Sequence, residues 1–389
     1  MAESADVLIV GGGIIGATLL DRLAREGVHA LLIEREGLAS GTTGRSLAIL
    51  GTQQPTALDI RLRQEGVRFY GELIEEYNLS FVRCGYLHLA RSAEQTERIR
   101  ETVALARELG EPVTLLAPSE LDEHLPGLRS ELYVAAGYAP QDGYLDGHEL
   151  VAALARRAGA RARSRGARVQ ILTGTAVLDL TLRGDRVQGV RTPKGDVSAS
   201  CVVVAAGPWT RRLLAPIGVS LPLSGVPGQI LVVRHTLGKA LPMAFDRDSH
   251  LYLRGEGPHR VLLGELDKAY RPDGGSDPDR IGDRPAPDFV ERATAGWTAA
   301  LPALAEGEAA GGWVGLRTVT PDARPVIGPV GPDGLWVVTG FSGHGIQLAP
   351  AAARMAVEGL LGNPQAIPQA FSPRRFAAPA DRACEETDG

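Results

Sequence analysis

Four glycines in the stretch GGGIIG, residues 11–16, have the type and spacing that bind phosphate. Gly11, Gly13 and Gly16 fit the pattern G-x-G-x-x-G. In this pattern the first glycine allows a tight turn, the second lets a pyrophosphate approach the backbone, and the third lets a helix pack closely on a strand. The start of the helix then offers free N–H groups and the positive end of its dipole. The chemistry indicated is dinucleotide binding.

The elements that must position these glycines follow in the expected order. A short apolar run, 7–10, is typical of a buried parallel strand, and apolar residues recur at helical spacing from Ile14 and Ile15 onward. A second strand, 29–33, ends in Glu34, where an acidic side chain accepts hydrogen bonds from an adenosine ribose. The alternative is an ordinary strand–helix–strand turn with a surface glutamate. That alternative does not explain why a strand, the glycines, a helix, a second strand and a terminal acid occur in this order. The motif by itself does not separate NAD from FAD.

Length, charge and cysteine content exclude several other classes of protein. The 389 residues predict two domains, and a net charge of −5 without a basic block disfavours nucleic acid as a partner. We find no apolar segment of transmembrane length and no signal peptide, so we expect a cytoplasmic protein. Cys84, Cys201 and Cys384 stand at no metal-like spacing, which predicts reduced thiols and no metal site.

Patterns along the chain divide it into two kinds of region. Helices are predicted over about 56–77, 93–109, 288–301 and 343–361, another begins after Asp146, and a short one capped by Ser119 covers 119–128. Parallel α/β patterns occupy the start, the middle and the end, and antiparallel strand patterns lie between them. We therefore predict an α/β fold (two-domain α+β) in which a discontinuous nucleotide-binding domain carries an inserted, mostly antiparallel substrate domain.

The predicted boundaries follow these patterns. The nucleotide-binding domain comprises 1–85, 142–218 and 312–380, the substrate domain comprises 86–141 and 219–311, and residues 381–389 form a tail. Because pockets often form between domains, we expect the site at this interface.

Six motifs in a fixed order carry a resemblance to a known family. They are GGGIIG with Glu34-Arg35, SGTTGRS (40–46), DGYLD (142–146), CVVVAAGPW (201–209), WVGLRTVTPDARPVIG (313–328) and GLWVVTGFSGHGIQLAP (334–350). Over nearly its whole length the chain resembles the FAD-dependent oxidoreductases of the D-amino-acid oxidase superfamily. It is most similar to glycine oxidase, the sarcosine oxidases and bacterial D-amino-acid dehydrogenases. The resemblance implies a Rossmann-like FAD-binding domain.

The resemblance also implies which residues hold FAD. They are Gly11, Gly13, Ile14, Ile15, Gly16, Glu34, Arg35, Thr42, Thr43, Gly44, Arg45, Ser46, Val177, Ala206, Gly207, Trp209, Gly340, Ser342, Gly343, His344, Gly345 and Ile346. Hydroxyls and glycines of SGTTGRS suit the diphosphate and the flavin edge, with Arg45 beside the phosphate or the ring. Val177 resembles a strand residue whose backbone meets the adenine. The glycines of GFSGHGIQ open a helix whose dipole would face the reduced flavin.

Two of these residues have equally good alternatives. Trp209 fits the second glycine turn under the dinucleotide, and it fits a plain core position equally well. His344 contacts the flavin or is a hydrogen-bonded turn residue, and we assign it no role as a base. The resemblance further implies non-covalent FAD, because Gly315 stands where the monomeric sarcosine oxidases carry the attaching cysteine.

Arg317 is the expected substrate residue, since glycine oxidase-like proteins place an arginine there. A guanidinium grips a carboxylate with two hydrogen bonds, and the alternative is a structural salt bridge. Tyr252 resembles an active-site tyrosine, Arg254 is a second candidate, and Arg324 is expected to face solvent or Asp322.

The activity implied is oxidation of the C–N bond of a small amino acid or N-methyl amino acid. A hydride passes to flavin N5, and the imine hydrolyses. The partners implied are a carboxylate-bearing amine as substrate and oxygen or another carrier as electron acceptor, and a homo- or hetero-oligomer is compatible with the family. Two alternatives stay open: a 2-hydroxy-acid oxidase or dehydrogenase on the same scaffold, and a flavin-bearing subunit of a larger complex.

Overall fold

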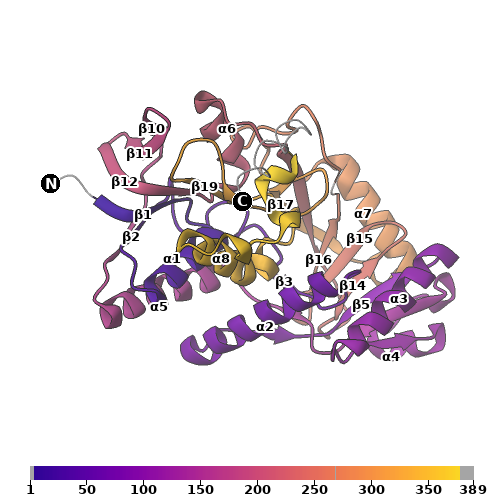
Figure 1. Ribbon diagram of the computed structural model, residues 1–389. Coiled ribbons are helices and arrows are strands. Elements are labelled where there is room, and N and C mark those ends of the chain that lie inside the picture. Colours follow the sequence, from indigo (N-terminus) through magenta and orange to yellow (C-terminus); the bar gives the residue numbers. More distant parts are fainter. Residues whose placement is uncertain (1–3, 268, 377–389) are drawn as a thin grey trace.

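The first of two large β-sheets is mainly parallel and lies with the N-terminus of the chain (Figure 1). The computed structural model describes residues 4–267 and 269–376. The sheet has the order β10-β11-β12-β1-β2-β9, with β19 beside β12 and β18 beside β19. The strands are β1 (Ser4–Val10), β2 (Ala30–Ile33), β9 (Val169–Leu172), β10 (Asp179–Arg183), β11 (Arg186–Thr192), β12 (Gly195–Val204), β18 (Val326–Pro329) and β19 (Leu335–Thr339). Segments from the start, middle and end of the chain thus share one sheet.

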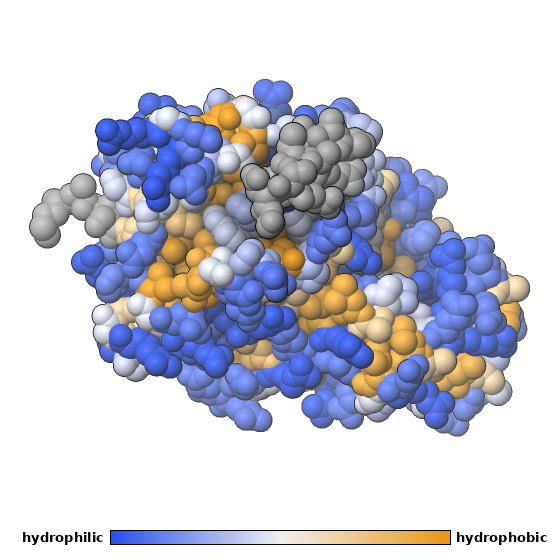
Figure 2. Space-filling model, in the orientation of Figure 1, coloured by the Kyte–Doolittle hydropathy of each residue, from blue (hydrophilic) through white to orange (hydrophobic). Residues whose placement is uncertain are grey.

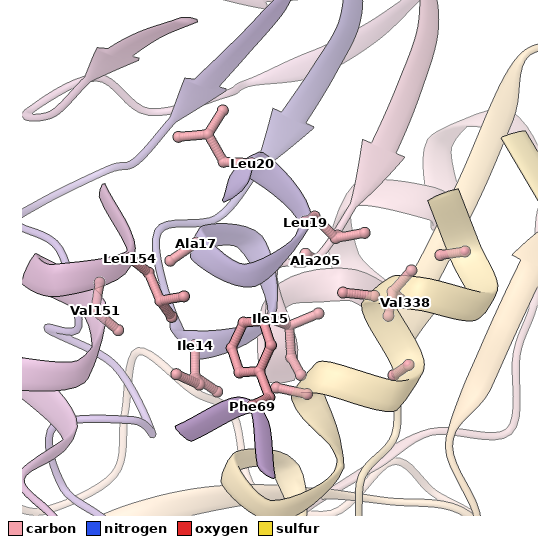
Figure 3. Close-up of a cluster of buried hydrophobic side chains, with 14 of the residues drawn as sticks. Ile14, Ile15, Ala17, Leu19, Leu20, Phe69, Val151, Leu154, Ala205 and Val338 are labelled. Carbon is pink, nitrogen blue, oxygen red and sulfur yellow. The ribbon is translucent and has the colours of Figure 1, made fainter. Parts of the chain in front are cut away.

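Three helices pack against this sheet because each presents an apolar face to its neighbours. Helix α1 (Ile14–Arg25) lies between α5 (Gly147–Arg165) and α8 (Gly345–Leu360), and α2 (Ala57–Tyr77) contacts α8. Figure 3 shows side chains of α1 meeting Val151 and Leu154 of α5 on one side and the yellow helix α8 on the other. This core fixes the start of α1, and with it the glycine turn.

The second sheet is mostly antiparallel and has the order β17-β13-β16-β15-β14-β5-β7-β6. Its strands are β5 (Tyr86–Ala90), β6 (Thr114–Leu116), β7 (Ala135–Ala139), β13 (Ser224–Arg234), β14 (Met243–Asp246), β15 (Leu251–Gly255), β16 (Arg260–Glu265) and β17 (Glu308–Val319). Helices α4 (Leu121–His124) and α7 (Pro287–Ala300) join one face in a single core. Helix α3 (Ala93–Glu108) covers part of the other face, which elsewhere borders the cavity described below.

Smaller elements connect the two lobes. Strands β3 (Ile49–Leu50), β4 (Val82–Arg83) and β8 (Gly143–Tyr144) form a three-stranded sheet, and α6 (Thr210–Leu214) follows a 3-10 turn at Gly207–Trp209. Figure 2 shows a mostly hydrophilic face with apolar residues in patches among the polar ones. None of the helices in the described chain combines the length and apolar character that a membrane crossing requires.

The predicted fold class is confirmed, with differences in detail. The predicted boundary at residue 312 falls inside β17, which pairs with β13 along its length, so the division into domains stays a prediction. Ser119 was expected to cap a helix, but it lies inside a 3-10 turn (Pro118–Glu120) that begins after Ala117. The reason is Pro118, which is preorganised for the first helical position. The predicted tail lies outside the described residues.

Candidate active site

A cavity of about 1430 Å³ runs between the two sheets. Pockets for drug-sized ligands measure roughly 300–1,000 Å³, so this one has room for more than a single small molecule. One wall is built from glycine turns and helix starts beside the first sheet, which we call the nucleotide wall. The other wall is a face of the second sheet, which we call the sheet wall.

The first glycine turn is as close-packed as the motif requires. Gly11 has a φ of +112°, and a Cβ there would lie 2.6 Å from the carbonyl oxygen of Ala205. A Cβ on Gly16 would lie 1.9 Å from the carbonyl oxygen of Gly11. Helix α1 begins after Gly13 with no acidic side chain in its first turn, and its Ile14 N–H donates to Thr43 Oγ1 at 3.0 Å. The positive end of α1 therefore faces the cavity.

Glu34 is held in position beside this turn. Its Oε2 accepts a hydrogen bond from the N–H of Gly12 at 2.6 Å, and its Oε1 accepts one from the N–H of Glu36 at 2.9 Å. Ile15 packs with Ile14 in the core behind the turn. The carboxylate thus lines the cavity in a fixed orientation, as the ribose-binding prediction requires.

The loop SGTTGRS ties the nucleotide wall to the sheet wall. Thr42 Oγ1 donates to the carbonyl oxygen of Leu316 at 2.7 Å, and Arg45 Nη1 donates to that of Val314 at 3.3 Å. Trp313 Nε1 donates in return to the carbonyl oxygen of Arg45 at 2.8 Å. Every residue of the loop except Gly44 lines the cavity. Gly44 lies behind them, where a Cβ would meet the ring of His148 at 2.3 Å.

The third glycine turn leads from β19 into α8. Gly340, Ser342 and Gly343 all have positive φ, and α8 begins after His344 with no acidic residue in its first turn, Gly345 and Ile346 included. Ser342 is fully buried, and its Oγ accepts a hydrogen bond from the N–H of Thr320 at 3.3 Å. The side chain of Ser342 therefore holds the turn in place, and the backbone faces the cavity.

The second glycine turn, at Ala206 and Gly207, carries a cluster of polar side chains that the sequence did not indicate. Trp209 Nε1 and Arg35 Nη1 each donate to Asp279 Oδ1 at 2.8 Å, and the Arg35 guanidinium lies 4.6 Å from the centre of the Trp209 ring. Trp209 lines the cavity beside Ala206 and Gly207 and belongs to no core cluster in the described chain, which rules out the core alternative.

Val177 was expected in a strand, and this prediction is wrong. It lies in the loop between β9 and β10, where it lines the cavity. Gly174, with a φ of +60°, ends the extended run, and Thr175 donates from its N–H to the carbonyl oxygen of Glu34 at 2.9 Å. The loop therefore folds back over the end of β2.

Arg317 and Tyr252 meet on the sheet wall. Arg317 Nη2 lies 3.4 Å from Tyr252 Oη and donates to the carbonyl oxygen of Glu265 at 3.1 Å, while Nη1 donates to that of Asp267 at 3.3 Å. Burial raises the pKa of Tyr252 and Arg317 lowers it, with burial the larger effect, so the hydroxyl stays protonated at neutral pH. In the part of the chain that the structure describes, Arg317 forms no ion pair with a carboxylate.

Glycines make room for both side chains. A Cβ on Gly264 would lie 2.2 Å from the Tyr252 ring, and one on Gly228 would lie 3.1 Å from the Arg317 guanidinium carbon. A Cβ on Gly343 would lie 3.4 Å from Arg317 Cδ. Arg317 therefore crosses the sheet beside the third glycine turn, at the junction of the two walls.

Two other arginines differ from their predictions. Arg254 does not line the cavity; it donates to the carbonyl oxygen of Leu47 at 2.9 Å and pairs with Glu256 at 3.3 Å. Arg324 was expected to face solvent or Asp322, but the Asp322 carboxylate binds the guanidinium of Arg375 at 2.8 Å and contacts Arg324 through its backbone N–H. The Arg324 side chain is thereby left to line the cavity.

Sequence analysis missed the residues at the far end of the sheet wall. They come from β5, β14 and the segment before α2, and they are Gln53, Tyr86, His88, Phe245 and Arg247. Period-two alternation was the available signal, since the intervening Leu87, Leu89 and Ala244 lie in the core on the opposite face. It could not show which face borders a cavity.

The nucleotide wall fits FAD. It presents three glycine turns, two helix starts without an acidic residue in the first turn, and an oriented carboxylate, which together suit a pyrophosphate and a ribose. Added Cβ atoms would close the first turn, so its shape depends on having glycine, without a side chain, at these positions.

Comparison with known proteins agrees with this arrangement. The family model described as FAD dependent oxidoreductase matches residues 6–359. Glycine oxidase of Geobacillus kaustophilus is 29% identical over 92% of this chain and 93% of its own length. The 4-methylaminobutanoate oxidase (formaldehyde-forming) of Paenarthrobacter nicotinovorans is 30% identical over 95% of this chain, which spans 45% of that longer protein.

Solved structures share the fold as well. L-proline dehydrogenase from P. horikoshii has a TM-score of 0.84 at 27% identity, covering 97% of this chain and 98% of its own. Glycine oxidase from Geobacillus kaustophilus has a TM-score of 0.76 at 26% identity, covering 92% and 94%. Sequence motifs, fold and site thus lead to one conclusion: the chain belongs to the FAD-dependent oxidoreductases of the D-amino-acid oxidase superfamily.

Proposed function

We propose that this chain, with FAD bound, oxidises the C–N bond of a small amino acid or N-methyl amino acid. The observation that carries the proposal is the position of Arg317. Its guanidinium lines the cavity beside the turn at Gly343 and has no carboxylate partner in the described chain. A carboxylate-bearing substrate supplies the partner that is missing.

The protein's own residues bind and orient this substrate. Arg317 donates two parallel hydrogen bonds to the carboxylate, which fix its plane as well as its position. Tyr252, neutral because burial raises its pKa, donates a further hydrogen bond from the same side. The α-carbon is then held toward the nucleotide wall, and such positioning contributes a large part of the rate.

FAD, when bound, takes up the two electrons of the oxidation. The α-carbon loses a hydrogen with its electron pair and the nitrogen loses a proton, which leaves a C=N bond that water hydrolyses to a carbonyl compound and an amine or ammonia. We assign binding of FAD to the turn at 11–16, Glu34, the loop at 40–46 and the turn at 340–345.

We also propose that FAD is held without a covalent bond. Gly315 replaces the cysteine of covalent relatives, and neither Cys84 nor Cys201 lines the cavity. Acid precipitation of the yellow protein should therefore leave all flavin in the supernatant. A yellow pellet would contradict this.

The names of the relatives support the substrate class. Besides glycine oxidase and 4-methylaminobutanoate oxidase, they include sarcosine dehydrogenase, of which the chain spans 28%, and dimethylglycine dehydrogenase, of which it spans 41–44%. Apart from glycine oxidase, these relatives are longer than this chain, so their full activities are not carried over. Their shared substrate type is an amine that bears a carboxylate.

Anaerobic bleaching of the flavin tests the proposal directly. The FAD-loaded protein is mixed with amino acids, N-methyl amino acids and 2-hydroxy acids, and absorbance near the flavin maximum is followed. We expect bleaching by an amine substrate, and readmission of oxygen or an artificial carrier then identifies the acceptor. Bleaching by hydroxy acids alone would replace the proposal with the hydroxy-acid alternative. No bleaching by any compound would favour a subunit that needs a partner.

A further inference from the structure

Arg247, like Arg317, is a cation on the sheet wall without a carboxylate partner in the described chain. It follows β14, two residues after Phe245, so both side chains lie on the cavity face of the sheet. Its Nε donates to Gln95 Oε1 at 3.3 Å, and its Nη1 lies 3.4 Å from His88 Nδ1. Both contacts are with neutral groups.

His88 cannot offset the charge. Arginine only donates hydrogen bonds, so Nδ1 of His88 is the acceptor and the ring is neutral. Burial, and then the charge of Arg247, lower the pKa of His88 to about 3. The nearest acidic side chain in sequence, Asp248, instead accepts hydrogen bonds from the N–H groups of Arg91 at 2.7 Å and Ser92 at 3.2 Å.

Arg247 is partly buried, and two buried arginines away from the cavity have carboxylate partners. Arg157 binds Asp21 at 3.0 Å in the core, and Arg254 binds Glu256 at 3.3 Å behind the sheet wall. A cation removed from water without an anion is costly, because nothing replaces its lost hydration. At the cavity, a ligand can supply the anion. Arg247 therefore resembles Arg317, the substrate-binding residue proposed above.

The spacing of the two arginines suits one small molecule. Arg317 lies over β16, where it donates to the carbonyl oxygen of Glu265, and Arg247 starts from the end of β14. Two strand spacings of about 4.8 Å separate β14 from β16, and the Arg247 guanidinium reaches toward His88 on β5, one strand further. The two guanidinium groups therefore stand roughly 10–14 Å apart. Between them Phe245 and Tyr252 lie opposite each other across β14 and β15. Two cationic ends with an aromatic floor fit a short carbon chain with an acid at each end.

We infer that Arg247 binds a second acidic group of the substrate, so that the enzyme acts on an amino or N-methylamino dicarboxylic acid. This inference rests on the proposed function, with the first carboxylate at Arg317. Arg247 would determine specificity and take no part in bond breaking. Its removal should therefore affect acidic substrates and leave neutral ones little changed.

Binding without turnover gives the first test. Calorimetry on the FAD-loaded protein compares glutarate with its monoamide, glutaramate, which has one carboxylate fewer and nearly the same shape. We expect glutarate to bind roughly tenfold or more tightly, as a lost charged hydrogen bond implies. Arg247→Met should abolish the difference. Arg98→Met is the matched control, because Arg98 adds positive charge near Arg247 but does not line the cavity.

Equal affinity for the two ligands, or a preference that survives in Arg247→Met, would overturn the inference. Should the methionine variant not fold, Arg247→Gln keeps a polar head beside Gln95 and provides the same comparison. Turnover of both enantiomers of glutamate and glutamine, and of their N-methyl forms, separates this inference from the proposed function. Failure of every amine to bleach the flavin, with the glutarate preference intact, would remove the proposed chemistry and leave the acidic subsite standing.

Discussion

The two walls of the cavity are made from different parts of the polypeptide. The nucleotide wall consists largely of backbone: glycine turns with positive φ and the first turns of α1 and α8. The sheet wall consists of side chains that alternate residues of neighbouring strands present to the cavity, with Arg317, Tyr252 and Arg247 among them. A wall of backbone recognises what all members of a family share, whereas a wall of side chains can change one residue at a time.

Removing the central side chain of the sheet wall should have the largest effect. Arg317→Ala is expected to retain FAD and fold, and to lose 2–5 kcal/mol in kcat/KM, roughly the range for breaking a buried charged pair. Arg317→Lys should recover only part, because a point charge cannot replace the two parallel hydrogen bonds. Steady-state kinetics with the best substrate of the bleaching panel measures both.

Arg292→Ala is the matched control for this prediction, since Arg292 lies on α7 and is half exposed. Unchanged kinetics in Arg317→Ala would remove this residue from the site. If FAD were lost together with activity, it would be wrong to assign FAD binding to the nucleotide wall alone and substrate binding to the sheet wall alone.

Glu34 supplies the carboxylate of the nucleotide wall, and its replacement tests the ribose-binding prediction. Glu34→Ala should weaken FAD binding by about 1.5–3 kcal/mol, the value of a hydrogen bond to a charged group. Part of the loss would come from the turn, because Glu34 Oε2 also binds the N–H of Gly12 at 2.6 Å. Titration of apoprotein with FAD, followed by quenching of flavin fluorescence, gives the dissociation constant. Wild-type affinity would show that the ribose is held by other groups.

A single methyl group should break the backbone wall. In Gly16→Ala the new Cβ would lie 1.9 Å from the carbonyl oxygen of Gly11, so the turn must move. We expect a loss of roughly 1–3 kcal/mol in the free energy of unfolding, and little bound FAD. Gly37→Ala, with nothing within 4 Å of the added Cβ, is the control. Flavin content and denaturant unfolding should separate the two variants, and equal behaviour would contradict the account of the turn.

The same contrast explains what could be predicted from sequence. The nucleotide wall comes from continuous stretches in which glycine spacing has few other causes, so its turns and helix starts were predicted. The sheet wall takes Tyr86 from β5, Arg247 and Tyr252 from the hairpin of β14 and β15, and Arg317 from β17, three segments that are far apart in sequence. Arg317 and Tyr252 were found through the family resemblance. Arg247 and Tyr86 could not be found, because alternation defines two faces and tertiary packing decides which one borders the cavity.

Asp279 joins the two walls, and its removal should have the smallest effect. It lies in the loop between β16 and α7, and its Oδ1 accepts hydrogen bonds at 2.8 Å from Trp209 and from Arg35, while Oδ2 binds Arg212. The hydrogen bonds from Trp209 and then Arg35 lower the pKa of Asp279 to about 2. Since this pKa lies below the ordinary value of 3.8, the stabilisation is present above that pH and is lost as the pH falls through about 2.

We therefore expect the contact to stay intact across neutral pH and FAD release to be insensitive to pH between about 5 and 8. Asp279→Asn keeps the shape and removes the charge, and because the side chain is exposed the effect should be about 0.5–1 kcal/mol. FAD should leave about two to five times faster, measured by flavin fluorescence after dilution into excess apoprotein scavenger. Asp283→Asn, exposed in the same loop but away from the cavity, is the control. Equal release rates in the two variants would mean that the walls are held together by the contacts of SGTTGRS with β17 alone.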